Sequence, residues 1–114
     1  MSNVPFLKAF ADAWNRHDVD SLMMHMAEDG VFISSSGAKA EGAEAVREAF
    51  ASVFECFPDA RWDEDTHFVS GNRGASEWLF SGTDAEDGSV VEEQGCDLFT
   101  FRDGKIVIKD TYLK

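Results

Sequence analysis

The chain has 114 residues, of which 44% are hydrophobic, and this length fits one domain built around one core. Its formal net charge is −12, from 22 acidic and 10 basic residues spread along the chain. A field of this sign repels nucleic acid and anionic membrane surfaces and disfavours phosphorylated substrates. We therefore expect a single domain over residues 1–114 whose partners include neither nucleic acid nor membrane.

The first residues, from Met1 to Phe10, lack a basic stretch followed by a long apolar core, and no apolar run reaches membrane-spanning length. Only two cysteines are present, Cys56 and Cys96, and their spacing indicates no disulfide framework. We expect each of them to be a small apolar core residue. These features together predict a cytoplasmic protein.

The three histidines do not form the spacing of a metal site. His25 and Glu28 are one helical turn apart, which is more typical of a surface pair than of two metal ligands, and His17 and His67 add no further pattern. We expect no metal and no cofactor.

Apolar residues recur at helical spacing near the start of the chain. A first helix is predicted to begin at a cap formed by Ser2 or Asn3, with Pro5 in its opening turn, and to end near Arg16. Its apolar stripe is formed by Phe6, Leu7, Phe10, Ala11 and Trp14.

Two more helices follow. The second is predicted to begin after its cap, Asp18, and to end at Gly30. The third follows the pair Glu41 and Gly42 and is halted by Pro58.

Between and after these helices the pattern indicates β-strands. A short strand is predicted from Val31 to Ser34, and the apolar period changes from 3.6 to 2 at Ala60. Four longer strands are predicted over these ranges: Ala60 to Ser70, Ala75 to Asp84, Val90 to Phe101 and Lys105 to Leu113. Helices followed by closely connected strands indicate an α+β domain, in which three helices pack on one face of a curved, mainly antiparallel sheet.

The segment from Cys96 to Asp110 carries the clearest local signal in the chain. Asp103 and Gly104 lie between two alternating runs, and this pair is typical of the tight turn of a β-hairpin. With that turn, one face of the hairpin carries Asp97, Phe99, Phe101, Ile106, Ile108 and Asp110. This face is rich in rings and ends in two opposed carboxylates.

Directly opposed carboxylates destabilise a strand pair unless one of them takes a proton or water surrounds both. In a dry pocket, desolvation and mutual repulsion would raise the pKa of Asp97 or Asp110, as acid/base catalysis requires. If instead the strand ends fray, or a bulge turns one aspartate to the other face, both are ordinary surface acids. Both interpretations stay open at this point.

The order of the predicted elements resembles the nuclear transport factor two-like superfamily, and within it the SnoaL-like domains, named for a polyketide cyclase. The local matches run across essentially the whole chain: Trp14 and Asp18, Glu28-Asp29, Glu41-Gly42, Phe57-Pro58-Asp59, Trp78 with Gly82-Thr83, and Gly95 to Ile106. The resemblance implies a cone-shaped α+β barrel around a hydrophobic cavity.

The resemblance to the cyclases implies that Asp97 is a catalytic acid/base. Those relatives have a histidine where this chain has Asp84. In the similar ketosteroid isomerases, the position of Asp97 holds a protonated aspartate that donates to an oxyanion. Their tyrosine falls at Phe10 here and their basic aspartate falls near Ser34, while epoxide hydrolases of the superfamily have an arginine at Gly95.

The enzyme hypothesis is that Asp97, assisted by Asp110, Asp84 or Tyr112, moves a proton next to a carbonyl group of a neutral, hydrophobic, cyclic ligand. Cyclisation of the aldol type and double-bond isomerisation both fit. The residues expected to contact the ligand are Phe10, Trp14, Phe32, Phe54, Trp78, Phe80, Phe99 and Tyr112.

Two alternatives stay beside it. The pocket could hold a ligand without catalysis, because the isomerase tyrosine and base and the cyclase histidine are replaced. The outer sheet face could also pair with a second copy in a homodimer, which would bury Cys96, Leu98 and Val107 between subunits. The sequence leaves all three hypotheses open.

Overall fold

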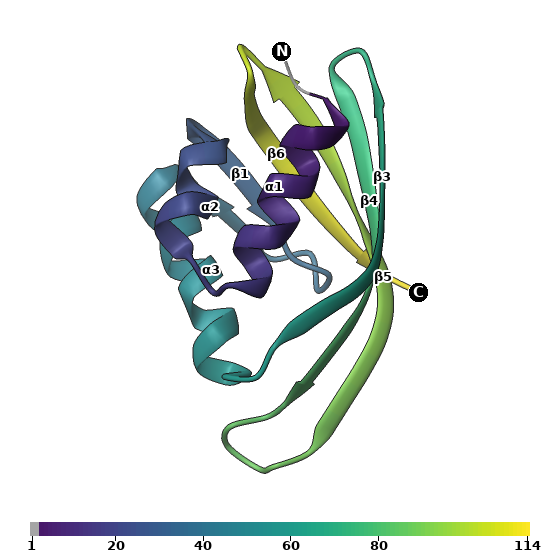
Figure 1. Cartoon of the computed structure of the whole chain (residues 1–114). Coiled ribbons are helices and arrows are strands. Elements are labelled where there is room, and N and C mark those ends of the chain that lie inside the picture. Colours follow the sequence, from purple (N-terminus) through teal and green to yellow (C-terminus); the bar gives the residue numbers. More distant parts are fainter. Residues whose placement is uncertain (1–2) are drawn as a thin grey trace.

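The computed structural model describes residues 3–114, in which three helices pack against one face of a six-stranded sheet (Figure 1). The helices are α1 (Val4–Asn15), α2 (Val19–His25) and α3 (Ala43–Cys56). The strands are β1 (Met26–Ile33), β2 (Lys39–Glu41), β3 (Arg61–Ser70), β4 (Arg73–Thr83), β5 (Val90–Arg102) and β6 (Lys105–Leu113). Their order in the sheet is β2-β1-β6-β5-β4-β3, and only the β1–β6 pair is parallel. The predicted α+β class is confirmed.

The sheet is strongly bent, and the helices lie on its concave side (Figure 1). Helix α1 crosses in front of the central strands, whereas the β4–β5 hairpin extends beyond the helices. The helical stripes and the concave face meet in a core formed by Leu7, Phe10, Ala13, Trp14, Leu22, Met26, Val46, Phe50, Phe99, Phe101 and Ile106. This arrangement leaves room for a cavity between α1, α3 and the outer part of the sheet.

The helix caps follow the expected chemistry. Asn3 caps α1 by accepting a hydrogen bond from the backbone N–H of Phe6 at 2.9 Å, while the other predicted cap, Ser2, lies outside the described residues. Asp18 caps α2 through the backbone N–H and the hydroxyl of Ser21, at 3.1 and 2.7 Å. These hydrogen bonds lower the pKa of Asp18, the one from the Ser21 hydroxyl having the largest effect.

The predicted end of the second helix, at Gly30, is wrong. Helix α2 ends at His25, because Met26 is extended and pairs with Ile106 of β6. Residues 27–30 then bulge out before Val31 pairs with Ile108, so the strand predicted from Val31 starts five residues earlier. A helix of seven residues has little stability of its own, and pairing with the central sheet outweighs its helical spacing. The short edge strand β2 was not predicted.

A bulge in β6 decides which side chains of the last hairpin face the core. Phe101 pairs with Ile106 as predicted, but Thr100 pairs with Ile108, so Val107 is an extra residue. Beyond this bulge Asp97 lies opposite Thr111, and Asp110 lies opposite Leu98 on the convex face. The predicted pairing of Asp97 with Asp110 therefore does not occur, and the alternative of a bulge that turns one aspartate to the other face is the one found.

A second bulge acts in the same way in the edge strand β3. Asp63 pairs with Leu79 and Thr66 pairs with Glu77, so Glu64 and Asp65 together lie opposite Trp78. Glu64 adopts a positive φ of 55° at this point. The extra residue turns Asp65 and His67 toward the concave side.

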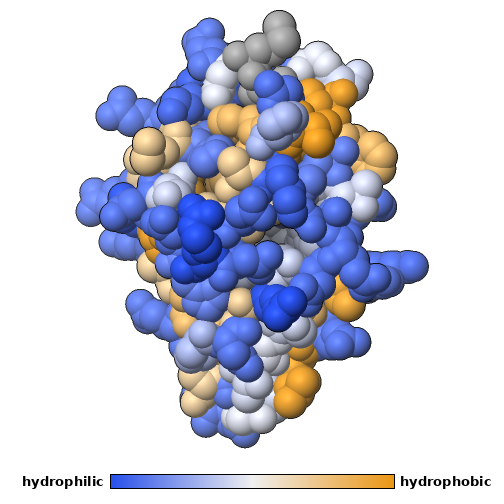
Figure 2. Space-filling model, viewed as in Figure 1, coloured by the Kyte–Doolittle hydropathy of each residue, from blue (hydrophilic) through white to orange (hydrophobic). Residues whose placement is uncertain are grey.

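The surface in view is mainly hydrophilic, with small scattered apolar groups (Figure 2). Of the two free cysteines, Cys56 is exposed at the end of α3, so its predicted place in the core is wrong. Cys96 is half-buried, and desolvation, followed by the charge of Asp97, raises the pKa of its thiol. No helix among residues 3–114 is long and apolar enough to cross a membrane.

Gly95 lies where the sheet has no space for a side chain. It pairs with Trp78, and a Cβ atom added to it would lie 2.6 Å from the indole ring and 2.6 Å from the backbone carbonyl oxygen of Tyr112. The carbonyl belongs to a paired strand, so it cannot move without disturbing the sheet.

We expect Gly95→Ala to lower the free energy of unfolding by about 1–3 kcal/mol, the usual cost of overpacking. Urea denaturation measures this change, and Gln94→Ala, on the exposed side of the same strand, is the control. Equal stability of the two variants would contradict the tight approach of Trp78.

Candidate functional site

A cavity of about 420 Å³ lies between the helices and the concave face of the sheet. This volume is in the range of small-molecule sites. Its walls are mainly apolar and include six of the eight ring residues predicted to contact a ligand: Phe10, Trp14, Phe32, Trp78, Phe80 and Phe99.

The other predicted residues lie elsewhere. Phe54 packs behind the wall, with its ring centroid 5.4 Å from that of Trp14. Tyr112 is half exposed on the convex face, where its hydroxyl donates to Asp110 at 3.0 Å, and this hydrogen bond raises its pKa. Asp84 lies in the β4–β5 loop and accepts hydrogen bonds from the backbone N–H groups of the next turn. Placing Asp84, Asp110 and Tyr112 in the pocket was wrong, because a turn and the β6 bulge direct them away.

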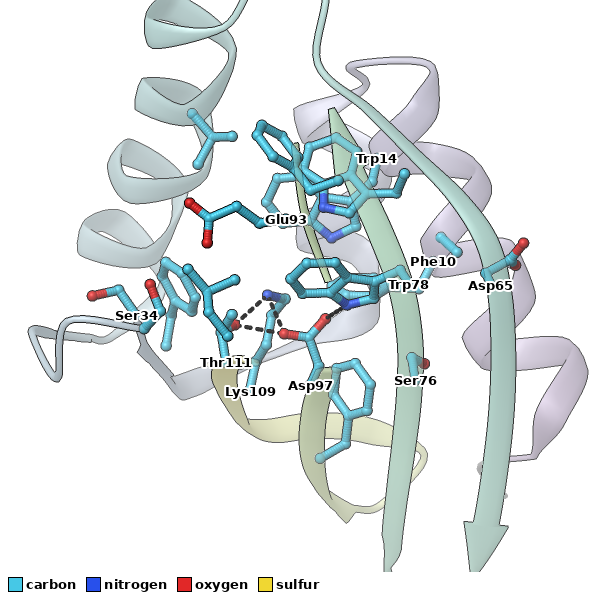
Figure 3. A pocket seen from close by; sticks show the side chains of 18 of the residues that line it. Phe10, Trp14, Ser34, Asp65, Ser76, Trp78, Glu93, Asp97, Lys109 and Thr111 are labelled. Carbon is cyan, nitrogen blue, oxygen red and sulfur yellow. Dashed lines mark hydrogen bonds and ion pairs between the residues drawn. The ribbon is translucent and has the colours of Figure 1, made fainter. Parts of the chain in front are cut away.

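Asp97 lies on the cavity wall and is 7% exposed. Its Oδ1 accepts hydrogen bonds from Lys109 Nζ at 2.9 Å and from Thr111 Oγ1 at 2.5 Å, and its Oδ2 accepts one from Trp78 Nε1 at 3.0 Å (Figure 3). A carboxylate has about four acceptor positions, so one position on Oδ2 is left for a ligand.

Lys109 provides the charge that balances Asp97. It is 5% exposed and lines the cavity, and its Nζ lies 4.7 Å from the ring centroid of Phe32 and 5.2 Å from that of Trp14. Besides Asp97, its ammonium donates to Thr111 Oγ1 at 3.0 Å. The charged partner of Asp97 is thus the cation Lys109 and not the second carboxylate that was predicted. Strict alternation places Lys109 on the outer face, so only recognition of the β6 bulge would have revealed it.

A second polar group lies on the cavity wall. His67 Nδ1 is 2.7 Å from Ser76 Oγ, and His67 Nε2 is 2.7 Å from Asp65 Oδ2. Asp65 also accepts a hydrogen bond from Lys8 Nζ of α1 at 3.0 Å. Burial alone would raise the pKa of Asp65, but the hydrogen bonds from Lys8 and His67 outweigh it and lower this pKa. Sequence reasoning tested His67 only as a metal ligand, and the β3 bulge hid its inward position.

One buried donor in the cavity wall lacks a partner. Trp14 is 7% exposed, and its Nε1 forms no hydrogen bond within residues 3–114. An unpaired buried N–H is unfavourable, and this atom has almost no accessible surface, so it is an unsatisfied donor of the core. No group of three potential metal-ligating side chains occurs in the described part of the chain.

Comparison with known proteins places this cavity in a family context. The family model of the SnoaL-like domain matches residues 7–108. The chain belongs to the SnoaL-like domain family. No curated protein matches the sequence.

Solved structures resemble this SnoaL-like domain over nearly its whole length. A Pseudomonas putida protein provisionally named a polyketide cyclase has a TM-score of 0.90 at 19% identity, with 100% of this chain and 92% of that chain covered. A Xanthomonas campestris protein with the same provisional name has a TM-score of 0.86 at 22% identity, covering 96% and 88%. An uncharacterised cystatin-fold protein from Novosphingobium aromaticivorans has a TM-score of 0.85 at 24% identity, covering 97% of both. At these identities the similarity shows the fold.

The buried ion pair predicts a large effect of removing one partner. We expect Lys109→Met to lower the free energy of unfolding of the SnoaL-like domain by about 3–5 kcal/mol, because it leaves the Asp97 carboxylate buried without its cation. Thermal and urea denaturation measure this effect. The double variant Lys109→Met/Asp97→Leu should regain a large part of the loss, and no recovery would contradict a dominant charge effect.

The lowered pKa of Asp65 predicts a defined pH dependence. A carboxylate whose folded pKa is depressed stabilises the fold above its unfolded pKa of about 3.9, and this contribution is lost as the pH falls through the folded pKa. The difference in unfolding free energy between the native chain and Asp65→Asn should therefore shrink as the pH is lowered from about 6 to about 3. Urea denaturation across this range measures it, and a constant difference would contradict the assignment.

Proposed function

We propose that this SnoaL-like domain binds a neutral, mainly apolar, cyclic ligand that carries a carbonyl group, and that Asp97 acts on it as a general acid/base. The observation that supports this proposal is the position of the Asp97 carboxylate, which lies on the wall of a ring-lined cavity and is joined there to Lys109. Carboxylates held in apolar pockets are recurrent acid/base groups.

The charges of the cavity disfavour an anionic ligand. Asp97 and Lys109 balance each other, and Asp65 is paired with Lys8 and with the His67 ring. Glu93 of β5 also lines the cavity and forms no ion pair within residues 3–114, so an anionic ligand would be repelled as well as dehydrated. The aromatic walls favour flat or cyclic apolar surfaces.

One donor on the cavity wall suits a ligand oxygen. Lys109 uses two of its three N–H bonds, on Asp97 and Thr111, and the third remains available. A carbonyl oxygen that reached this ammonium would gain a charge-assisted hydrogen bond.

The chemistry that follows is a proton transfer at carbon. The free position on Asp97 Oδ2 takes a proton from the carbon next to the carbonyl group, and the bonding electrons move into an enolate. The ammonium of Lys109 stabilises the negative enolate oxygen. Return of the proton to another carbon gives isomerisation. Attack of the enolate carbon on a second carbonyl group gives cyclisation, and Asp97 then protonates the new alkoxide.

The provisional names of two similar structures agree with this reaction class, because both are called polyketide cyclases. The alternative is a pocket that holds its ligand without catalysis. This alternative is favoured because Asp97 and Lys109 already neutralise and hydrogen-bond each other, as they would in an ion pair with a purely structural role. The homodimer expected from the sequence stays a prediction.

Exchange of ketone protons for deuterium tests the enzyme proposal. We expect the native protein to catalyse this exchange next to the carbonyl group of β-tetralone in D₂O, and Asp97→Asn to slow it by about 10²–10⁴-fold, the usual contribution of a general base. Asp97→Asn leaves the buried Lys109 ammonium without its counter-ion, so the comparison is made at a temperature at which circular dichroism shows the variant to be folded. Binding of the ketone to the folded variant, measured by calorimetry, should persist, because asparagine keeps the shape and one acceptor oxygen. Proton NMR measures the exchange.

Asp110→Asn is the matched control, since it removes the same charge from the convex face of the same strand pair. Equal exchange in Asp97→Asn and in the native protein would exclude Asp97 as the base. Binding without exchange in the native protein would favour the non-catalytic alternative.

A further inference from the structure

Four polar side chains form a row across the concave face of the sheet. His67 of β3 pairs with Ser76 of β4, Ser76 pairs with Asp97 of β5, and Asp97 pairs with Thr111 of β6. All four line the cavity. Ser76 therefore lies next to Asp97 in the sheet. The hydrogen bond of its hydroxyl group runs the other way, to His67, which in turn contacts Asp65.

The hydrogen-bond partners of His67 indicate which of its two ring nitrogens carries the proton. The lowered pKa of Asp65 means that its carboxylate is ionised near neutral pH and only accepts hydrogen bonds. His67 Nε2 must therefore donate to Asp65, so Nδ1 of the neutral ring carries a lone pair and accepts the hydroxyl proton of Ser76. The basic Nδ1 atom of His67 is thus connected to the cavity by the hydroxyl group of Ser76.

The same chain of groups leads outward to solvent. The side chain of His67 is 5% exposed and that of Asp65 is 21% exposed, whereas Lys8 on α1 is 53% exposed. The groups that face His67 are Asp65 from its own strand, Ser76 from β4 and, one strand further, Asp97 from β5. Each step from Ser76 to Lys8 is a hydrogen bond of 2.7 to 3.0 Å.

We propose that Ser76, His67 and Asp65 form a second acid/base centre, which exchanges a proton with a phenolic or enolic hydroxyl group of the bound ligand. The ligand hydroxyl gives its proton to Ser76 Oγ, while the Ser76 proton passes to His67 Nδ1. The bound ligand becomes an oxyanion and His67 becomes an imidazolium, whose charge Asp65 balances. Reversal of both transfers returns the proton.

The proposal deepens the proposed function, because it assigns an oxygen proton to one end of the row and leaves the carbon proton to Asp97. Ser76 and His67 are the catalytic residues of this centre, and Asp65 is a positioning residue that fixes the ring and its tautomer. Ser76 Oγ has His67 as its side-chain partner within residues 3–114, and its lone pairs remain open to a ligand proton.

The first test reads the tautomer of His67 in the ligand-free protein by two-bond proton–nitrogen NMR of ¹⁵N-labelled chain. We expect neutral His67 to carry its proton on Nε2. Two other histidines are internal references: His17 Nε2 lies 2.8 Å from the carbonyl oxygen of Ala60, and His25 Nδ1 lies 2.8 Å from that of Ser21, so they should show opposite tautomers.

Two variants distinguish the roles of Ser76 and Asp65 in the same proton–nitrogen NMR spectrum. Ser76→Ala should shift the Nδ1 signal of His67 and leave His25 unchanged. Asp65→Ala should reduce the Nε2–H population, which a merely structural loss of packing would not do. A proton on Nδ1 of neutral His67, or an imidazolium that persists to alkaline pH, overturns the proposal.

The second test uses 4-nitrophenol, whose absorbance distinguishes phenol from phenolate. With the native protein in excess we expect a larger phenolate fraction than with Ser76→Ala, and an unchanged fraction overturns the proposal. Because no ketone is involved and Asp97→Asn should leave the His67 tautomer unchanged, failure of this centre is distinguishable from failure of Asp97 as a base.

Discussion

The burial of an ammonium and a carboxylate inside an aromatic core is the constraint on which the rest of the site depends. Each ion alone would lose several kcal/mol on leaving water, so Lys109 and Asp97 are stable there only in contact with each other and with further partners. The sheet provides these partners from three adjacent strands, through Trp78 on β4, Asp97 on β5 and Thr111 on β6. The ring face of Phe32 adds a further favourable contact for the ammonium.

This constraint also shapes the cavity as a reaction environment. A protein with a net charge of −12 has few cations, yet one of its ten basic residues is almost fully buried at this point. The result is a locally neutral ion pair in an acidic protein, with fixed donors and one open acceptor position. Preorganised dipoles of this kind stabilise developing charge without having to reorient. The proposed ligand, which is uncharged at rest and becomes anionic during reaction, would use this arrangement.

Alternating and helical patterns predicted the elements well, because burial of apolar side chains enforces them. The limits of β5 and β6 and the Asp103-Gly104 turn follow directly from these patterns. The faces of the strands were predicted less well, since one extra residue reverses every side chain beyond it. Lys109 and His67 were missed for this reason, and neither bulge has a glycine or another local residue pattern that would mark it. Helix α2 was predicted too long because its helical spacing does not reveal competition from a distant strand.

The two bulges mean that the chemistry of the cavity depends on chain length as much as on residue identity. Removal of the extra residue in β6 would restore simple alternation and direct a different set of the same side chains inward, with no substitution at any site position. A single-residue insertion or deletion in such a strand would thus change the lining of the cavity without any substitution. Among SnoaL-like domains that share a fold at low identity, equivalent residues are therefore better matched by strand register than by sequence position alone.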